Sequence, residues 1–125
     1  MLDHVLVLLA HSENHRRFDV EMITRCIMPP LKLAQHTGIV EDGRLMAWGS
    51  WAFMKPDKAE VFLDGRMKIA AHEWNEGETL VMMDFVAPFG HAMQLQRKMR
   101  DLFPGQVGRW IRHSKRKRVE VRNVK

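Results

Sequence analysis

Cysteine occurs only once in these 125 residues, so the chain cannot form an internal disulfide. The sequence also has neither a Cys-x-x-Cys pair nor a His-Glu-x-x-His string, the usual spacings of zinc ligands. Its longest apolar run is Val5–Ala10, far below the roughly 20 residues that cross a bilayer. Asp3 stands where a signal peptide would carry positive charge. We therefore expect a cytoplasmic protein without a metal site or a membrane span.

Length and composition predict one folded domain. Domains usually run to about 100–150 residues, so a second core would lack material. With 46% hydrophobic and 28% charged residues, the chain can bury a core and is not polar enough to be intrinsically disordered. We expect a single domain over residues 1–125.

Positive charge is concentrated near the C-terminus. The formal net charge is +5, yet residues 109–125 alone carry +7 and the other residues together carry −2. The cationic side chains of that segment are Arg109, Arg112, Lys115, Arg116, Lys117, Arg118, Arg122 and Lys125. The basicity of the protein therefore belongs to one element, which could attract a polyanionic partner.

Apolar periodicity and turn residues predict the order of helices and strands. Helices are expected over residues 2–10, from Asp19 to the pair Pro29-Pro30 that should end or kink it, over 56–63 and over 91–103. Strands are expected over residues 37–41, 45–53, 79–86, 107–111 and 119–124, with a hairpin turn at Asp42-Gly43. This order predicts an α+β fold in which helices pack around a mainly antiparallel, mixed sheet. It is compatible with the acyl-CoA N-acyltransferase (GNAT)-like folds, although a fold alone does not establish chemistry.

Five short motifs follow one another in an order and spacing known from one family. They are Ser12–Arg16, Pro29 with Gln35, Gly49–Phe53, Glu73–Glu78 and Asp84–Gly90. The last block, Asp-Phe-Val-Ala-Pro-Phe-Gly, is the most specific. Over about residues 5–112 the sequence resembles the RTX toxin-activating lysine acyltransferases, the hemolysin-activating proteins.

The resemblance implies a fold, a reaction and a site. The family has a variant of the N-acyltransferase fold and moves a fatty acyl group from acyl carrier protein to internal lysine ε-amines of a protoxin. The donor would be the phosphopantetheine thioester of the carrier protein, with no tightly bound cofactor. The catalytic histidine of the family falls on His15 and its catalytic aspartate on Asp84, and Ser12 matches a serine that accompanies the histidine.

The sequence departs from the family pattern in two places. It stops at Lys125, whereas family members typically continue through a Gly-rich segment and a terminal helix, so the sequence resembles a C-terminally shortened member. His91 stands where an acidic residue commonly follows the Pro-Phe-Gly block. The first departure bears on the protoxin target, which could be another lysine-bearing protein.

Lysine acylation makes a positioned base useful. At its usual pKa of about 10.4, only about one lysine in 2,500 is neutral at pH 7, a cost of about 4.6 kcal/mol. Histidine is mostly neutral at that pH and can accept the amine proton during attack on the thioester. A carboxylate at the end of a buried strand, such as Asp84, would need a partner, and an imidazole would satisfy it.

Several of these residues also have ordinary structural interpretations. His15 is one of seven histidines and could be a loop residue, and Asp84 could cap the Pro88–Gly90 turn. Ser12 is a hydrogen-bonding partner rather than a nucleophile, because no Gly-x-Ser-x-Gly elbow surrounds it. Trp48, Trp51 and Phe53 predict a packed sheet face, with an acyl channel as the alternative. Cys26 lies on an apolar helix face and is expected to be inert.

The donor is inferred from what the sequence lacks and from its charge. No Arg/Gln-x-x-Gly-x-Gly/Ala turn for the pyrophosphate of acetyl-CoA is present. Acyl carrier proteins are strongly acidic and would be steered to a positive surface. The expected donor-docking residues are Arg112, Lys115, Arg116, Lys117 and Arg118.

Two other function classes stay open. A GNAT-like binding module that has lost catalysis could contact nucleic acid or a host protein through the basic hairpin. A small structural protein of a larger assembly is the third class. His15 and Asp84 favour the enzyme, because phosphate binding requires neither. The acyl chain length, the target protein and homodimer formation are left open by the sequence.

Overall fold

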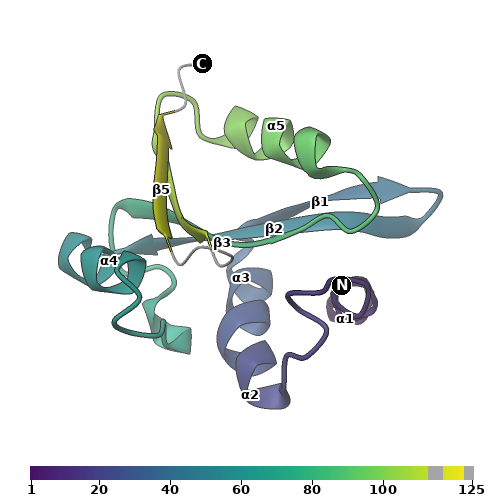
Figure 1. Ribbon diagram of the computed structural model, residues 1–125, viewed down its shortest axis with the longest axis horizontal. Helices are drawn as coiled ribbons and strands as arrows, with labels where there is room; N and C mark the ends of the chain where they lie inside the picture. The colour runs from purple at the N-terminus through teal and green to yellow at the C-terminus, as the bar shows by residue number, and fades with distance from the viewer. Residues whose placement is uncertain (113–116, 123–125) are drawn as a thin grey trace.

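The computed structural model describes residues 1–112 and 117–122, which form helices packed against a mixed sheet (Figure 1). The helical elements are α1 (Leu2–Leu9), α2 (Val20–Met22), η1 (Ile23–Ile27), α3 (Met28–Leu33), α4 (Pro56–Leu63), η2 (Ala71–Glu73) and α5 (Ala92–Leu102). The strands are β1 (His36–Glu41), β2 (Arg44–Met54), β3 (Thr79–Val86), β4 (Val107–Arg112) and β5 (Lys117–Arg122). Within these residues, none of the helices is both long enough and apolar enough to cross a membrane. The α+β class is confirmed.

The sheet has the order β1-β2-β3-β4-β5 and is antiparallel except where β3 and β4 run parallel. Asp42 and Gly43 join β1 to β2 with φ values of 50° and 77°. Positive φ at both central residues is the conformation that the Asp-Gly pair tolerates in a tight hairpin turn. The predicted hairpin is therefore confirmed.

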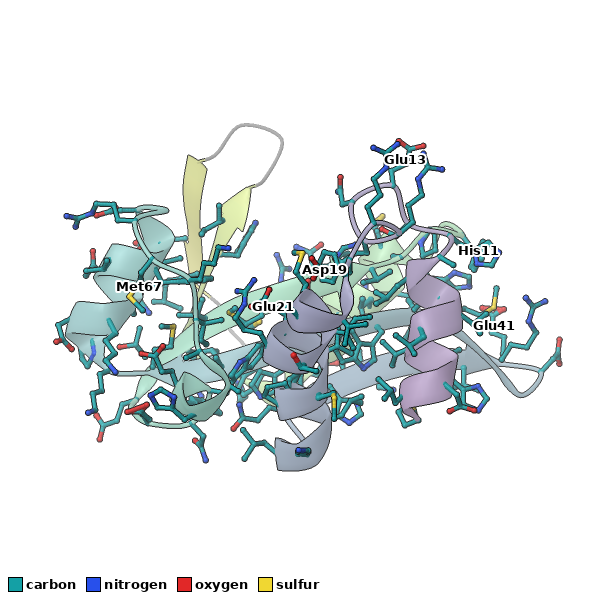
Figure 2. All side chains as sticks on the ribbon, turned by 90° about the horizontal axis from the view of Figure 1, so that it is seen from below. His11, Glu13, Asp19, Glu21, Glu41 and Met67 are labelled. Carbon is teal, nitrogen blue, oxygen red and sulfur yellow. The ribbon has the colours of Figure 1, made fainter. Side chains whose placement is uncertain are left out.

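The helical segment from Val20 to Leu33 continues through its two prolines. Asp19 caps its start, because a carboxylate oxygen accepts from the Met22 N–H at 2.9 Å, and Figure 2 shows Asp19 at this helix end. Pro29 and Pro30 lack the N–H groups that would bond to the carbonyls four residues earlier. The chain widens into the π-helical turn η1, and the carbonyl of Arg25 accepts from the indole N–H of Trp74 at 3.0 Å. The prolines therefore do not end the helix.

Helices cover both faces of the sheet. Figure 1 shows α5 over one face and α1, α2 and α3 over the other. The α5 face buries Ile39, Ala47, Trp51, Leu80, Leu95 and Met99. The opposite face buries two clusters, one with Val5, Leu8, Leu9, Ile27, Trp48 and Val86, the other with Ala52, Met54, Ala59, Leu63, Ile69, Trp74 and Val81. The alternation of β2 therefore places Trp48 and Trp51 on opposite faces.

Two polar contacts attach α5 to the β1-β2 hairpin. His91, the residue before α5, bonds through Nε2 to a carboxylate oxygen of Glu41. Lys98 donates from Nζ to the carbonyl of Gly38 at 2.6 Å. These contacts hold the helix along the sheet.

The pairing of β3 contains a bulge. Gly49 is registered with Phe85 and Trp51 with Met82, so two residues of β3, Met83 and Asp84, lie opposite the single residue Ser50. A bulge of this kind shifts the alternation of side chains and re-aims one of them. Accordingly, Met82 packs on the α5 face, whereas Val86, which strict alternation would place on that face too, packs against Trp48 on the other.

Candidate active site

His15 lies in a compact polar turn between α1 and α2. The carbonyl of Ser12 accepts from the backbone N–H groups of His15 and Arg16 at 3.1 and 2.9 Å, and the carbonyl of His15 accepts from the N–H of Phe18. The ring of Phe18 lies 5.1 Å from the imidazole, between ring centres. Figure 2 shows this segment at the sheet face that carries the first helices, with Glu13 at its tip directed away from the sheet. The turn buries His15 and leaves its neighbours exposed.

Both ring nitrogens of His15 are hydrogen-bonded. Nε2 lies 3.1 Å from a carboxylate oxygen of Asp84, and Nδ1 lies 2.7 Å from the hydroxyl oxygen of Ser12. Because a carboxylate only accepts, a neutral imidazole donates to Asp84 from Nε2 and accepts from the Ser12 hydroxyl at Nδ1. The side chains of His15 and Asp84 are 10% and 11% exposed. The prediction that these two residues meet is confirmed.

Asp84 occupies the bulge of β3. Its backbone N–H donates to the hydroxyl of Ser50 at 3.1 Å, in place of a backbone acceptor on β2. Ser50 is fully buried. The carboxylate is thereby turned toward His15 rather than toward the Pro88–Gly90 turn. The sequence did not identify Ser50, although it lies inside the Gly49–Phe53 motif.

A cavity of about 380 Å³ opens beside the His15–Asp84 pair. Pockets of this size hold small organic ligands. Its lining residues are Asn14, His15, Leu80, Met82, Met83, Asp84, Phe85, Ala92, Met93, Gln96, Met99, Arg100, Phe103, Gln106, Gly108, Trp110 and Ile111. Met82, Met99 and Phe103 belong to the α5 face, whereas Met83 and Ile111 pack on the opposite face.

The cavity therefore passes between β3 and β4. These two strands share one registered pair, Val81 with Arg109, and both contribute to the walls. In Figure 1 the C-terminal hairpin stands away from the plane of the first three strands. A ligand in this gap would touch apolar side chains from α5 and, at one end, the imidazole and carboxylate of the site.

Two aromatic residues of β2, Trp51 and Phe53, lie behind Phe103, a residue of the cavity wall. Trp51 and Phe53 contact the ring of Phe103 edge-on, with ring centres 4.9 and 6.2 Å apart. Phe103 itself lines the cavity, whereas Trp48, Trp51 and Phe53 do not. The burial of Trp48 and Trp51 and these ring contacts support the packed-face interpretation, and the acyl-channel alternative stays a prediction.

Cys26 is protonated at neutral pH. Burial raises the pKa of its thiol to about 11, and the negative charge of Asp84 adds to the shift. The thiolate is the nucleophilic form of cysteine. Cys26 is therefore not positioned as a nucleophile of this site.

Three of the five predicted docking residues lie on the C-terminal strands β4 and β5. Arg112 ends β4, and Lys117 and Arg118 begin β5, whereas Lys115 and Arg116 lie outside the described residues. Since β4 also supplies Gly108, Trp110 and Ile111 to the cavity, a partner on this hairpin would lie next to the site. Their role in docking stays a prediction.

Another group of ionisable residues lies at η2. His72, Glu73 and Glu76 bring potential metal-ligand atoms within 4.8 Å of one another. Lys58 approaches Glu73 at 2.8 Å and Lys55 approaches Glu76 at 3.5 Å, so both carboxylates already have cationic partners. We interpret this group as an ion-pair network.

The mixed sheet flanked by helices is consistent with an N-acyltransferase-like fold, and the His15–Asp84 pair lines a cavity that β3, β4 and α5 border. The chain matches the RTX toxin acyltransferase family over residues 1–125 and therefore belongs to it. It is 30% identical over 112 residues to the RTX-II toxin-activating lysine-acyltransferase ApxIIC of Actinobacillus pleuropneumoniae, which covers 90% of this chain and 70% of that protein. It is 31% identical over 112 residues to the leukotoxin-activating lysine-acyltransferase LtxC of Aggregatibacter actinomycetemcomitans, and this match covers 90% of this chain and 67% of LtxC. The protein is an acyltransferase, as the motifs predicted.

Proposed function

We propose that this protein transfers a fatty acyl group from acyl carrier protein to the ε-amine of a lysine in a target protein. The observation that carries the proposal is the buried His15–Asp84 pair, 3.1 Å apart, at the edge of an apolar cavity. The named relatives are lysine acyltransferases that activate toxins, which supports lysine as the acceptor and a protoxin as the target. The reaction would take place in the cytoplasm, within one domain.

In this reaction the carbon–nitrogen bond forms as the carbon–sulfur bond of the thioester breaks. The imidazole Nδ1 holds the lone pair that accepts the amine proton, and the Ser12 hydroxyl, 2.7 Å away, can relay it. Asp84 fixes the ring tautomer through Nε2 and stabilises the imidazolium that results. The imidazolium then returns the proton to the departing thiolate, so the products are an amide and a free phosphopantetheine thiol.

The cavity supplies the site for the acyl chain. Most of its wall is apolar, with methionine, leucine, phenylalanine and tryptophan side chains. Burying each methylene of an acyl chain there contributes about 0.8 kcal/mol. Methionine side chains adapt to a flexible alkyl chain because they have three rotatable bonds and a polarisable sulfur. A fatty acyl group therefore fits this wall better than an acetyl group does.

The charge of the C-terminal segment supports an acidic donor protein. Residues 109–125 carry +7, and β4 of this segment forms part of the cavity wall. A carrier protein attracted to the hairpin would deliver its phosphopantetheine arm to the gap between β3 and β4. The phosphopantetheine arm would therefore be part of the donor substrate and not a cofactor bound by this protein.

One experiment tests the proposed function. The protein is incubated with palmitoyl-acyl carrier protein and a candidate RTX-type protoxin, and lysine mass shifts of the protoxin are read by mass spectrometry. Palmitoyl-CoA replaces the carrier-protein donor in a parallel reaction. Acyl-lysine formed from the carrier-protein donor supports the proposal, while transfer from CoA alone contradicts the donor assignment. Nucleic-acid binding without transfer to any target would favour the binding-module alternative.

A further inference from the structure

Met99 lies between the core of the α5 face and the cavity. Its side chain is 5% exposed and packs with Leu95 and Trp51, while its remaining side lines the cavity. Met82, Met83 and Met93 also line this cavity, beside the ring of Phe103. A movement of this one thioether therefore changes the space available to a ligand.

Gly49 of β2 lies directly behind this thioether. A Cβ atom built on Gly49 would lie 2.6 Å from Sδ and 2.9 Å from Cε of Met99, far inside van der Waals contact. The φ angle of Gly49 is not positive, so its backbone conformation does not require glycine. The reason for glycine at this position is space: the end of Met99 occupies the place of the missing side chain.

The core limits where Met99 could move. Leu95 and Trp51 are buried beside it, and well-packed interiors have little room for an additional atom. The cavity is the open side of the Met99 side chain. A methyl group at position 49 would therefore displace the thioether into the cavity.

We propose that Met99, seated on Gly49, is the residue that determines how long an acyl chain the enzyme accepts. The inference rests on the proposed function, because it names a selectivity element of the same site. With glycine at position 49, the Met99 thioether lies against the β2 backbone, and the cavity stays open to a long acyl chain. The pair sets the usable length of the cavity and leaves the His15–Asp84 chemistry unchanged.

The test compares donors that differ only in the alkyl chain. Lauroyl-, myristoyl- and palmitoyl-acyl carrier proteins are supplied to wild type, Gly49→Ala and Met99→Ala, and kcat/KM is measured for each donor. One methylene that no longer fits changes kcat/KM by about 10–200-fold. We expect the palmitoyl-to-lauroyl ratio to fall at least about tenfold in Gly49→Ala and to rise in Met99→Ala. In the double variant the new methyl group meets no thioether, so the ratio returns toward that of wild type or beyond.

A matched glycine in the same sheet controls for strain. A Cβ atom on Gly38 would meet a methyl group of Leu45 at 2.7 Å and the carbonyl of Ala47 at 2.9 Å, and Gly38 does not line the cavity. Gly38→Ala should lower thermal stability but leave the chain-length ratio as in wild type. Met99→Leu, which keeps nearly the same volume, should keep the wild-type ratio, and Gly49→Ala alone carries the test if Met99→Ala unfolds.

The outcomes separate this inference from the proposed function. If wild type transfers acyl groups and the palmitoyl-to-lauroyl ratio is unchanged in folded Gly49→Ala, the inference is wrong while the proposed function stands. If wild type transfers no acyl group from any donor, the proposed function fails first. A uniform loss of rate with all donors in Gly49→Ala would show damage to the neighbouring Asp84 and would also contradict the inference.

Discussion

The backbone N–H of Asp84 donates to the buried hydroxyl of Ser50, 3.1 Å away, at the point where β2 and β3 shift register. This hydrogen bond satisfies an amide that the bulge removes from the ladder, and it fixes the carboxylate that faces His15. A residue that touches no substrate therefore determines where the carboxylate points.

Replacing Ser50 by alanine should destabilise the protein and slow the reaction. An unsatisfied buried N–H costs about 1–3 kcal/mol, and the freed bulge would let Asp84 turn away from His15. We expect kcat to fall with little change in KM, measured together with thermal melting. Thr24→Ala removes an exposed hydroxyl that bonds to the carbonyl of Glu21 and serves as the control. An unchanged kcat in a folded Ser50→Ala variant would show that the bulge holds its shape without this bond.

Cys26 should resist alkylation in the native state. Burial raises its thiol pKa to about 11, against about 8.5 for an exposed cysteine, so little thiolate exists at pH 8. Labelling with iodoacetamide should be slow in the folded protein and fast in urea. Because the folded pKa is raised, the stability contributed by the half-buried thiol is present below pH 9 and is lost as pH rises toward 11. Rapid native labelling would contradict the burial of this side chain, and Cys26→Ala should keep acyl transfer.

Stability should fall in mild acid through His36. Burial lowers its pKa below the usual 6.5, and the N-terminal amino group adds a smaller shift in the same direction. Its Nδ1 accepts from the Trp48 indole at 3.1 Å, a bond that protonation of Nδ1 would break. The unfolded chain protonates first, so the stability falls as pH drops below about 6.5. Thermal melting of wild type and His36→Gln from pH 7 to pH 5 should show the smaller pH dependence in the variant; parallel curves would exclude His36 as the source.

The basic hairpin should act on association rather than on chemistry. Exposed charges steer an acidic partner over a range of about 8 Å at physiological salt. Neutralising Lys115, Arg116, Lys117 and Arg118 should weaken binding of acyl carrier protein and leave the rate at saturating donor intact. Binding is measured against carrier protein and duplex DNA at two salt concentrations. A loss confined to DNA would assign the hairpin to nucleic acid instead.

Local signals in the sequence predicted most of the elements. Asp42-Gly43 identifies its hairpin because few residue pairs tolerate positive φ twice, and residues 56–63 and 79–86 have the bounds that proline, glycine and apolar runs predict. The continuation of the helix through Pro29 and Pro30 was not predictable in the same way. Pro29 has no N–H to donate to the carbonyl of Arg25, and the indole N–H of Trp74, far along the chain, donates to it instead. Tertiary contacts decided that case.

The site was predictable only in part. The family motifs placed His15 and Asp84 in one site, and their side chains do meet. Alternation along β3 would have directed Asp84 to the face of Leu80 and Met82, since nothing in the local sequence marks the bulge. The contact between Met99 of α5 and Gly49 of β2 likewise could not be predicted, because it forms only in the packed fold.

Acyl transfer by His15→Ala and Asp84→Asn tests the central claim most directly. His11→Ala is the matched control, because His11 lies in the same segment, is exposed, and contacts the carbonyl of Val7 and the ring of Phe89 rather than Asp84. With palmitoyl-acyl carrier protein and a protoxin, we expect acyl-lysine formation to fall about 10²–10⁴-fold in His15→Ala, as for loss of a general base, and to fall markedly in Asp84→Asn. The His11→Ala rate should match wild type. Folded His15→Ala protein that forms acyl-lysine at the wild-type rate would contradict the assignment of His15 as the catalytic base.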